Sequence, residues 1–430
     1  MKRQLDDWLE NYMRFTQRTE PPTLYHLWSG IVAISSALRR KCYCNWGALR
    51  GYVYPNLFVA LVGPPGGRKG TAMKIAKTMV QKLDDVSLGA DSYGSSQALY
   101  KGIINSEASY IERNGLAKKH KSLCVWAEEF NVFLSDRDMN LISSLTDLFD
   151  CADEWRYESL ARKEEKISNC FLTIFGAITP SLLQAKLTQE AVGGGLLSRI
   201  IFVVGYGPIR RVALPFTSEE EEILNSKLNN DLQQIAQLSG PFKMENSFFK
   251  KYARWYENST AADGIQDDKF MGYNSRRALH LNKLCMVISA SENDDMLIKG
   301  HHFDKALAIL EATEKEMDNA FYGLGLSDRT GVYAKFLDFV KSRKEFTWTE
   351  LLQKLHQDIN SIDELRGFIE IGVQSKLLKE EVSPTTSNYV VQKQDYVVSS
   401  NDYLINTVLS KMDENIKNKE SQNDDKKRSD

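Results

Sequence analysis

The sequence predicts an α/β fold built around a parallel β-sheet. Four short apolar segments read as buried strands, at residues 56–63, 123–127, 170–178 and 199–205. Stretches with helical spacing of apolar residues separate these segments, and buried strands that alternate with helices are typical of a parallel sheet covered on both faces. The first segment also leads into a glycine-rich turn followed by a helix, which points to a binding loop.

Length and composition limit the classes of protein that remain. The chain has 430 residues, of which 42% are hydrophobic and 26% charged, with a formal net charge of -2. The composition is that of a globular protein, and the length corresponds to about two to four domains. Because the whole chain is not basic, any nucleic acid must bind through local basic patches.

Cysteine spacing and hydropathy exclude further classes. The 6 cysteines form no C-x-x-C pair, which argues against zinc and favours buried thiols. The N-terminal residues lack the apolar core of a signal peptide, and no apolar run approaches the about 18 residues that cross a bilayer. We therefore expect a cytoplasmic protein without membrane association.

Changes in pattern along the chain predict five regions. Beyond residue 216 helical patterns dominate, beginning with capping-box spacing at Thr217 and Glu220. After residue 327 the predicted order is helix, strand, two helices and a hairpin, which is that of a winged helix-turn-helix; Thr347/Glu350 and Ser361/Glu364 have capping-box spacing. The regions are an N-terminal helical region (1–50), an α/β core (51–213), a helical lid (214–326), the winged helix (327–395) and a charged tail expected to be disordered (396–430).

The glycine-rich turn "GPPGGRKGT" is close to the phosphate-binding P-loop pattern G-x-x-x-x-G-K-[ST]. Arg68 replaces the second glycine and Gly70 replaces the hydroxyl residue that contacts magnesium. We expect Arg68, as a helix-entry residue, to have an ordinary φ. Loop amides, the helix N-terminus and the lysine would bind phosphates, and the alternative is a chance glycine-rich turn. The candidate nucleotide-binding residues are Gly63, Pro64, Pro65, Gly66, Gly67, Arg68, Lys69, Gly70 and Thr71.

Two adjacent acids follow the next predicted strand. Glu128 and Glu129 come directly after the apolar segment "LCVWA". Glu128, together with Thr71, would hold Mg²⁺, and Glu129 would polarise the attacking water, as phosphoryl transfer requires. A solvated acidic turn is the alternative interpretation.

Two more polar residues flank later strands. Thr179 follows the strand at 170–178, where it could hold the lytic water, although threonine before proline is also ordinary turn chemistry. Arg199 follows three consecutive glycines and precedes an apolar strand. It is predicted to act as an arginine finger on the nucleotide of a neighbouring subunit, or else to be a surface arginine at a strand edge.

The motifs "GPPGGRKGT", "VWAEEF", "FGAITP" and "GGGLLSRIIFVV" together resemble those of the YfjI-like P-loop proteins of phages and mobile elements. Members of that family are described as replicative or primase-associated helicases. Their order is also similar to that in AAA+ ATPases (AAA+/RecA-like fold) of the MCM and superfamily-three helicase type. The resemblance covers about residues 20 to 325. It implies ATP and Mg²⁺ as cofactors and assembly into a homo-oligomeric ring, specifically a hexamer. It also implies a location in the cytoplasm of a bacterial host. It also implies single-stranded DNA and a primase or other replication protein as partners, and it places Arg276 at the sensor-two position.

Candidate nucleic-acid contacts lie in three places. Residues 154–169 could form a hairpin with Arg162 and Lys163 near its tip, or a charged helix. In the helicases just named such a hairpin lines the pore and tracks the backbone of DNA. The "KKHK" segment (118–121) reads as an exposed basic turn. The second helix of the winged module has few basic residues, which favours protein or single-strand contacts over duplex reading.

These features predict an ATP-hydrolysing, ring-forming motor, a DNA helicase of phage or mobile-element replication. Two alternatives stay open. One is an ATP-dependent clamp, loader or assembly factor that does not translocate. The other is a regulator in which the P-loop controls a winged helix that binds DNA.

Overall fold

A computed structural model gives the fold in two compact units, residues 1–320 and residues 321–403. The first unit is described over residues 2–320 except for 47–50, 94, 112–114, 131–138, 160–161, 187–194, 260–263 and 266–269. The second is described over 336–391 except for 337–338, 341–342, 344, 357–358, 360–361, 375–377 and 383–386. The tail predicted to be disordered (396–430) lies outside the described residues.

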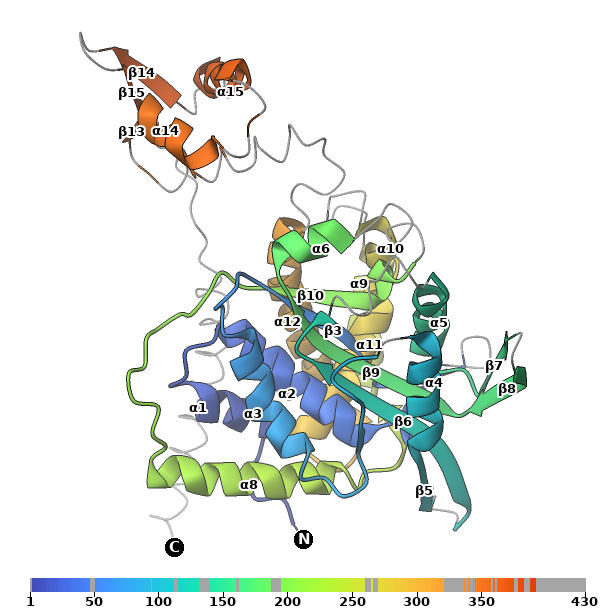
Figure 1. The fold of residues 1–430 in the computed structure, drawn as a ribbon. Helices are drawn as coiled ribbons and strands as arrows, with labels where there is room; N and C mark the ends of the chain where they lie inside the picture. Colours follow the sequence, from blue (N-terminus) through green and yellow to red (C-terminus); the bar gives the residue numbers. More distant parts are fainter. Residues whose placement is uncertain are drawn as a thin grey trace, which may run out of the picture. The chain divides into compact units, whose positions relative to one another are not determined.

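A six-stranded sheet forms the centre of the first unit (Figure 1). Its order is β10-β3-β9-β6-β4, with β5 paired to β6. Neighbouring strands are parallel throughout except that β5 runs antiparallel to β6. The predicted parallel α/β sheet is therefore confirmed. The strands are β3 (Phe58–Val62), β4 (Ser87–Leu88), β5 (Glu107–Ile111), β6 (Ala117–Ala127), β9 (Cys170–Ile178) and β10 (Ile200–Val204).

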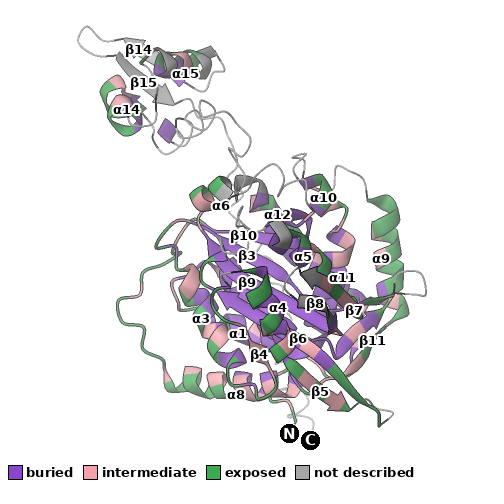
Figure 2. Cartoon of the chain, turned by 45° about the vertical axis from the view of Figure 1, so that its right-hand side comes forward, coloured by how far each residue is buried: buried purple, intermediate pink, exposed green. Residues whose placement is uncertain are grey.

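Burial explains why three strands of this sheet, β3, β9 and β10, are almost entirely apolar. Every residue of β3, β9 and β10 is buried, because helices cover both faces of the sheet (Figure 2). The helices that follow strands in the chain are α3 (Lys69–Val80), α4 (Ser96–Asn105), α5 (Met139–Phe149) and α6 (Pro180–Lys186). All six cysteines are buried and free, as predicted.

The N-terminal helices belong to the same compact unit as the sheet. They are α1 (Trp8–Thr16) and α2 (Thr23–Leu38), separated at the predicted proline break. Asp7 caps α1 by accepting from the amides of the first turn. In α2 all but two residues are buried, and the indole of Trp28 donates to the Thr313 hydroxyl (2.9 Å). The described residues of the predicted N-terminal region, 2–46, thus contribute to the core on which the site is built.

The segment after residue 216 is not all helical, which corrects the expectation. Its helices are α8 (Glu219–Ile235), α9 (Asn246–Asn258), α10 (Met271–Asn274), α11 (Arg277–Glu292) and α12 (Gly300–Ala320). Between them β11 (Gly240–Met244) and β12 (Leu297–Ile298) join β1 (Cys42–Asn45) and β2 (Tyr52–Val53) in a second sheet, ordered β12-β11-β1-β2. These strands are short, and β11 pairs with β1, about 200 positions earlier in the chain, so local patterning does not reveal them. The capping box also lies one residue later than predicted, at Ser218 and Glu221.

Two further segments test the predictions for basic residues. Residues 154–169 form the predicted hairpin, β7 (Glu154–Ser159) and β8 (Arg162–Ser168), rather than a helix. The "KKHK" residues lie within strand β6, where they pair with β5, and not in a turn. That prediction was wrong because four consecutive polar side chains leave no apolar signal for a strand. Among the described residues, no helix combines the length and apolarity needed to cross a membrane.

The second unit contains a small sheet and two helices. Its elements are β13 (Glu345–Thr347), α14 (Trp348–Leu355), α15 (Ile362–Gln374), β14 (Leu378–Val382) and β15 (Ser387–Val391), with strand order β13-β15-β14. The capping box of Thr347 and Glu350 is confirmed. Ser361, proposed as the cap of the next helix, and most of the helix predicted at 331–343 lie outside the described residues. A separate apolar core includes Phe336, Phe346, Leu351, Leu365 and Phe368.

Candidate nucleotide site

The predicted loop and the predicted acids lie at the carboxyl edge of the central sheet, which is formed by the carboxyl ends of its parallel strands. The glycine-rich loop follows β3, Thr179 follows β9, and Glu128 follows β6. Because these strands are parallel and β9 lies between the other two, all three positions are at the carboxyl edge. Ligands of open parallel sheets bind at this edge. The sheet topology therefore collects residues that are more than a hundred positions apart in the chain.

Gly63 is required by close packing at the start of the loop. A Cβ atom on Gly63 would lie 2.3 Å from the Tyr25 hydroxyl oxygen and 2.5 Å from the Gly205 carbonyl oxygen. That hydroxyl donates to the carbonyl oxygen of Val62 (2.7 Å) and also contacts that of Gly205 (3.1 Å). Tyr25 in α2 thus fixes the ends of β3 and β10 beside the loop. It was not predicted, since nothing in its local pattern distinguishes it from a core tyrosine.

We expect Gly63→Ala to destabilise the protein by about 1–3 kcal/mol, because a methyl group here must displace a buried ring and a backbone carbonyl. Gly70→Ala is the matched control: the nearest atom to its Cβ, in Glu128, is 3.9 Å away. Chemical denaturation of the two variants measures the difference. Equal free energies of unfolding would show that the loop entry is not constrained as described.

Arg68 differs from the expectation in its backbone. Its φ is 62°, in the left-handed region, although we predicted an ordinary value. The loop keeps the conformation that a glycine would adopt, which costs about 1–3 kcal/mol for another residue. Its guanidinium Nε forms an ion pair with Glu20 Oε2 (2.5 Å), a residue of the connection between α1 and α2.

Lys69, the first residue of α3, folds back over the loop. Its ammonium donates to the carbonyl oxygens of Gly63 (2.5 Å) and Pro64 (2.9 Å). Partial burial lowers its pKa from the usual value. Gly66 has a φ of 75° and open space where a side chain would stand. A lysine held against an open turn at a helix N-terminus suits an anionic group with several oxygens.

Gly70 lies beside Glu128, as the predicted metal site requires. Within the described part of the chain, the one atom found within 4 Å of a Cβ built on Gly70 is the Glu128 carboxyl carbon (3.9 Å). A hydroxyl at this position would therefore reach the space in front of the carboxylate. Thr71 is exposed and stands about 100° further round the helix, so it does not take the place of that hydroxyl. Magnesium would be held by Glu128 and by water, with Glu129, also exposed, next to it.

We expect Gly70→Ser to lower the Mg²⁺ concentration needed for nucleotide binding by about threefold to tenfold, since it adds an oxygen ligand of the kind Mg²⁺ prefers. The space beside Gly70 admits the side chain. Titration of Mg²⁺ at fixed nucleotide measures the effect, with Gly70→Ala as the control. An identical Mg²⁺ requirement in both variants would contradict the placement of the metal.

Thr179 lies between the loop and the acids at the same edge. It follows β9 directly, and its hydroxyl accepts weakly from the Leu182 amide (3.4 Å) at the start of α6. The side chain is half-buried. Its position is compatible with holding a water near a terminal phosphate, and its capping bond is ordinary turn chemistry.

Arg199 lies at the opposite edge of the sheet from the loop, the edge formed by the amino-terminal ends of the strands. It ends a short 3₁₀ turn (Leu197–Arg199), and the next residue, Ile200, pairs with Phe58 at the beginning of β3. The loop begins after the other end of that strand, about 17 Å away at 3.3 Å per residue. Arg199 is thus separated from the loop of its own chain by the length of the sheet.

Arg276 lies next to Arg199 and not beside the loop. Its Nε donates to the Ser198 hydroxyl (2.9 Å). The sensor-two expectation placed Arg276 at the nucleotide, but the structure does not bring it to the nucleotide loop of its own chain. Burial, followed by the charge of Arg199, lowers the pKa of Arg276.

The charge around Arg199 is unbalanced. Its side chain is 7% exposed and pairs with Asp150 (3.1 Å), while its Nε has no hydrogen-bond partner among the described residues. Lys283 is buried close by, over the Phe149 ring (4.1 Å), and burial lowers its pKa to about 8. Three basic side chains, those of Arg199, Arg276 and Lys283, thus lie near the one carboxylate of Asp150. A cluster with this excess of positive charge favours the binding of an anion. We call Arg199, Arg276 and their edge of the sheet the arginine edge.

The β7–β8 hairpin projects from the same edge. Asn169 donates its amide to the Asp153 carbonyl oxygen (2.8 Å), which closes the base of the hairpin directly before β9. Arg162 opens β8 opposite Ser159, next to the turn, as predicted; the side chains of Arg162 and Lys163 lie outside the described residues. An aromatic cluster that was not predicted supports the hairpin, and it comprises Tyr100, Trp155 and Tyr157 with ring centroids 4.5–5.2 Å apart.

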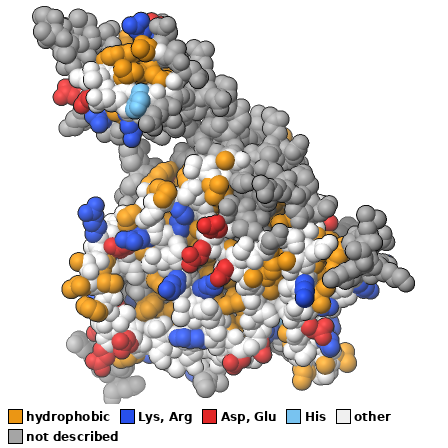
Figure 3. All heavy atoms as spheres, in the orientation of Figure 1, with side chains coloured by type: hydrophobic (Ala, Val, Ile, Leu, Met, Phe, Trp, Pro, Cys, Tyr) orange, Lys and Arg blue, Asp and Glu red, His pale blue; other side chains and the backbone are white. Residues whose placement is uncertain are grey.

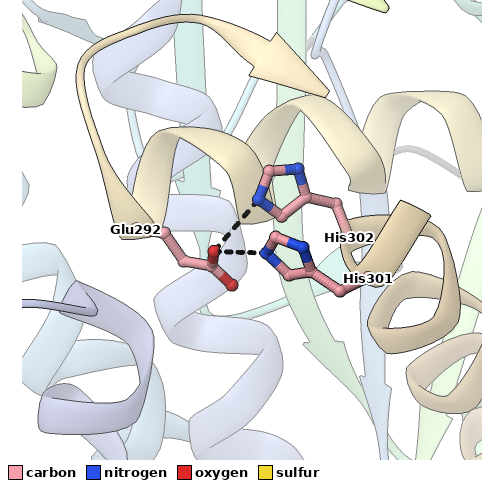
Figure 4. Close-up of side chains that lie close together, drawn as sticks. All are labelled: Glu292, His301 and His302. Carbon is pink, nitrogen blue, oxygen red and sulfur yellow. Dashed lines mark hydrogen bonds and ion pairs between the residues drawn. The ribbon is translucent and has the colours of Figure 1, made fainter. Parts of the chain in front are cut away.

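A second group of polar residues joins α11 to α12 (Figure 4). Glu292 Oε2 accepts from His301 Nε2 (2.7 Å) and His302 Nε2 (3.0 Å). The ligand atoms of these three residues lie within 4.8 Å of one another. However, His302 Nδ1 accepts from the Lys299 amide (2.9 Å), so its proton is on Nε2 and that nitrogen has no lone pair for a metal. Lys305 adds a positive charge 3.2 Å from the other Glu292 oxygen. The group is better explained as an internal charge network.

Comparison with known proteins does not place the chain in a family. No model of a known protein family matches the sequence, and no curated protein shows significant similarity to it. The resemblance to helicase-type ATPases stays a prediction that depends on the motifs alone. The geometry of the site is therefore the basis for a functional assignment.

Proposed function

We propose that this protein binds and hydrolyses ATP with Mg²⁺ as part of a homo-oligomeric ring, and that it moves single-stranded DNA through the ring. One observation carries the proposal. The loop and the acids lie at the carboxyl edge of the sheet, whereas both arginines lie at the opposite edge. A single copy does not bring the arginines to its own nucleotide, and in this proposal a second copy supplies them.

Each residue has a defined part in this reaction. The loop amides and Lys69 hold the phosphates, and Glu128 orients the water shell of Mg²⁺. Glu129 accepts a proton from the attacking water, which Thr179 helps to position. Arg199 of the neighbouring copy stabilises charge on the transferred phosphoryl group, and Arg276 reinforces it. The order of these motifs and the position of β9 between β3 and β6 support a P-loop core of AAA+ type.

The hairpin supports the DNA part of the proposal. It leaves the sheet directly before β9, the strand that leads to Thr179, so a displacement at the nucleotide could reach its base. On the face drawn in Figure 3, acidic and basic side chains are interspersed rather than gathered in one broad basic area. DNA contact through a local element such as Arg162 and Lys163 fits that surface better than wrapping would. The element order of the second unit supports a winged helix. The few basic residues of its second helix favour protein or single-strand contacts for this unit.

The test measures ATP turnover with and without single-stranded DNA, and unwinding of a forked duplex. We expect wild type to hydrolyse ATP faster with DNA and to separate the strands, whereas Lys69→Ala should do neither. Arg162→Ala with Lys163→Ala should retain basal turnover and lose the stimulation by DNA. ATP turnover that DNA does not change would contradict the motor.

Two observations favour an assembly factor as the second candidate. Arg199 is held by Asp150 inside its own chain, and Gly70 lacks the usual metal-binding hydroxyl. Both features would slow hydrolysis, which suits a nucleotide-dependent clamp or loader. ATP-dependent assembly on DNA without unwinding would favour this candidate.

A further inference from the structure

An exposed apolar segment begins next to the nucleotide loop. Residues 206–216, which we call the strap, connect β10 to α8. Several of its large apolar side chains point to solvent: Tyr206 is 68% exposed, Ile209 45%, Leu214 71% and Phe216 83%. The strap forms the left margin of the view in Figure 1, and hydrophobic side chains are exposed along that margin in Figure 3. Apolar surface concentrated in one segment commonly marks an interaction site.

The strap is tied to the phosphate loop through Glu20. The backbone amides of Ile209 and Val212 donate to Glu20, the first to its carbonyl oxygen (3.0 Å) and the second to its Oε1 (3.1 Å). The other carboxylate oxygen pairs with Arg68 in the loop (2.5 Å). One carboxylate is therefore shared between the strap and the residue that replaces a loop glycine.

We propose that the strap is a contact surface for a second copy of this chain, and that Glu20 makes its position depend on the nucleotide. The inference depends on the proposed function, which brings the arginine edge of another copy to the carboxyl edge where the strap begins. That arginine edge carries its own exposed apolar residue, Met271 of α10, 65% exposed and close to Arg276 in the chain. Apolar groups would then meet beside the paired arginines and phosphates.

The link to the nucleotide follows from charge. A triphosphate in the loop brings several negative oxygens near Arg68, and these compete with Glu20 for the guanidinium. The same phosphates repel the Glu20 carboxylate. When the ion pair between Glu20 and Arg68 breaks, the hydrogen bond from the Val212 amide to the Glu20 carboxylate weakens as well. The strap is then free to contact the second copy.

The first experiment tests the contact surface. Leu214→Ser with Phe216→Ser should raise the concentration needed for association in the presence of Mg²⁺ and a slowly hydrolysed ATP analogue by tenfold or more, as measured by sedimentation. Nucleotide binding by single subunits should stay within twofold of wild type. Ile362→Ser with Val373→Ser, which changes exposed apolar residues of the second unit (51% and 37% exposed), is the control.

The outcomes separate this inference from the proposed function. If nucleotide binds and association is unchanged by the strap substitutions, the strap inference is overturned while the proposed function stands. If wild type binds no nucleotide, both are overturned. Equal loss of association in the control would also overturn the inference, since the strap would then have no special part.

The second experiment tests Glu20 in the strap variant, which should remain as single subunits. Trypsin cleavage after Arg210 and Arg211 reports the freedom of the strap, and nucleotide should accelerate it several-fold. Adding Glu20→Gln should remove this acceleration. Glu316→Gln is the control, because Glu316 in α12 also accepts a hydrogen bond from the strap, donated by Tyr206. Cleavage that is indifferent to nucleotide, or an acceleration that survives Glu20→Gln, would refute the link.

Discussion

Replacing Arg199 with alanine should lower ATP turnover by about 10³–10⁵-fold, the range typical of an arginine supplied across an interface. The reason is geometric: Arg199 precedes the strand residue that pairs with Phe58, so it lies at the opposite sheet edge from its own loop. Steady-state turnover at saturating Mg²⁺ and ATP measures the loss. Binding of ATP to single subunits should be nearly unchanged.

Mixing two inactive variants separates action across subunits from action within one. Arg199→Ala subunits keep an intact loop, and Lys69→Ala subunits keep an intact arginine. A mixture should therefore recover turnover far above that of either variant alone. A mixture as inactive as its components would show that Arg199 acts within its own chain or only stabilises the fold. Thermal denaturation of Arg199→Ala reports the second effect, since the variant leaves Asp150 without its partner.

Glu129→Gln should lower turnover by about 10²–10⁴-fold, because an amide of the same shape cannot accept the proton of the attacking water. Affinity for Mg²⁺ and ATP should change little. Glu128→Gln is the matched comparison, one position earlier on the same strand end. It should instead raise the Mg²⁺ requirement, since Glu128 is the acid that lies beside Gly70.

A Mg²⁺ titration of both variants distinguishes the two roles. If Glu129→Gln weakens Mg²⁺ binding and Glu128→Gln leaves it intact, the assignments are reversed. If both variants keep full turnover, neither acid belongs to a hydrolytic site. Burst measurements of phosphate release separate the chemical step from product release.

Four strands of the central sheet were predictable because burial makes them apolar over much or all of their length, whereas the short β4 and the alternately exposed β5 were not predicted. A strand such as β9, with all nine residues buried, leaves a continuous apolar segment in the sequence. Lys69 and the two glutamates were predictable for a related reason, since the loop and the acids each follow such a segment. The hairpin at 154–169 was also correctly placed, because alternation marks its strands.

Other features depend on contacts that sequence patterns do not carry. The left-handed φ of Arg68 reflects the shape of the loop, and the need for Gly63 arises from Tyr25, far earlier in the chain. The strands β11 and β12 are too short to be recognised without their distant partners. Arg276 was assigned to the nucleotide site from the resemblance, but only the packing of α10 and α11 shows that it lies beside Ser198.

Equilibrium binding of ATP in the presence of Mg²⁺ tests the central claim most directly. We expect saturable binding by wild type that depends on Mg²⁺. The affinity should be lower by about tenfold or more in Lys69→Ala, because a charge-assisted contact to phosphate is worth about 1.5–3 kcal/mol. Absence of saturable binding by wild type, or equal binding by Lys69→Ala, would contradict a triphosphate site formed by the loop and the two glutamates.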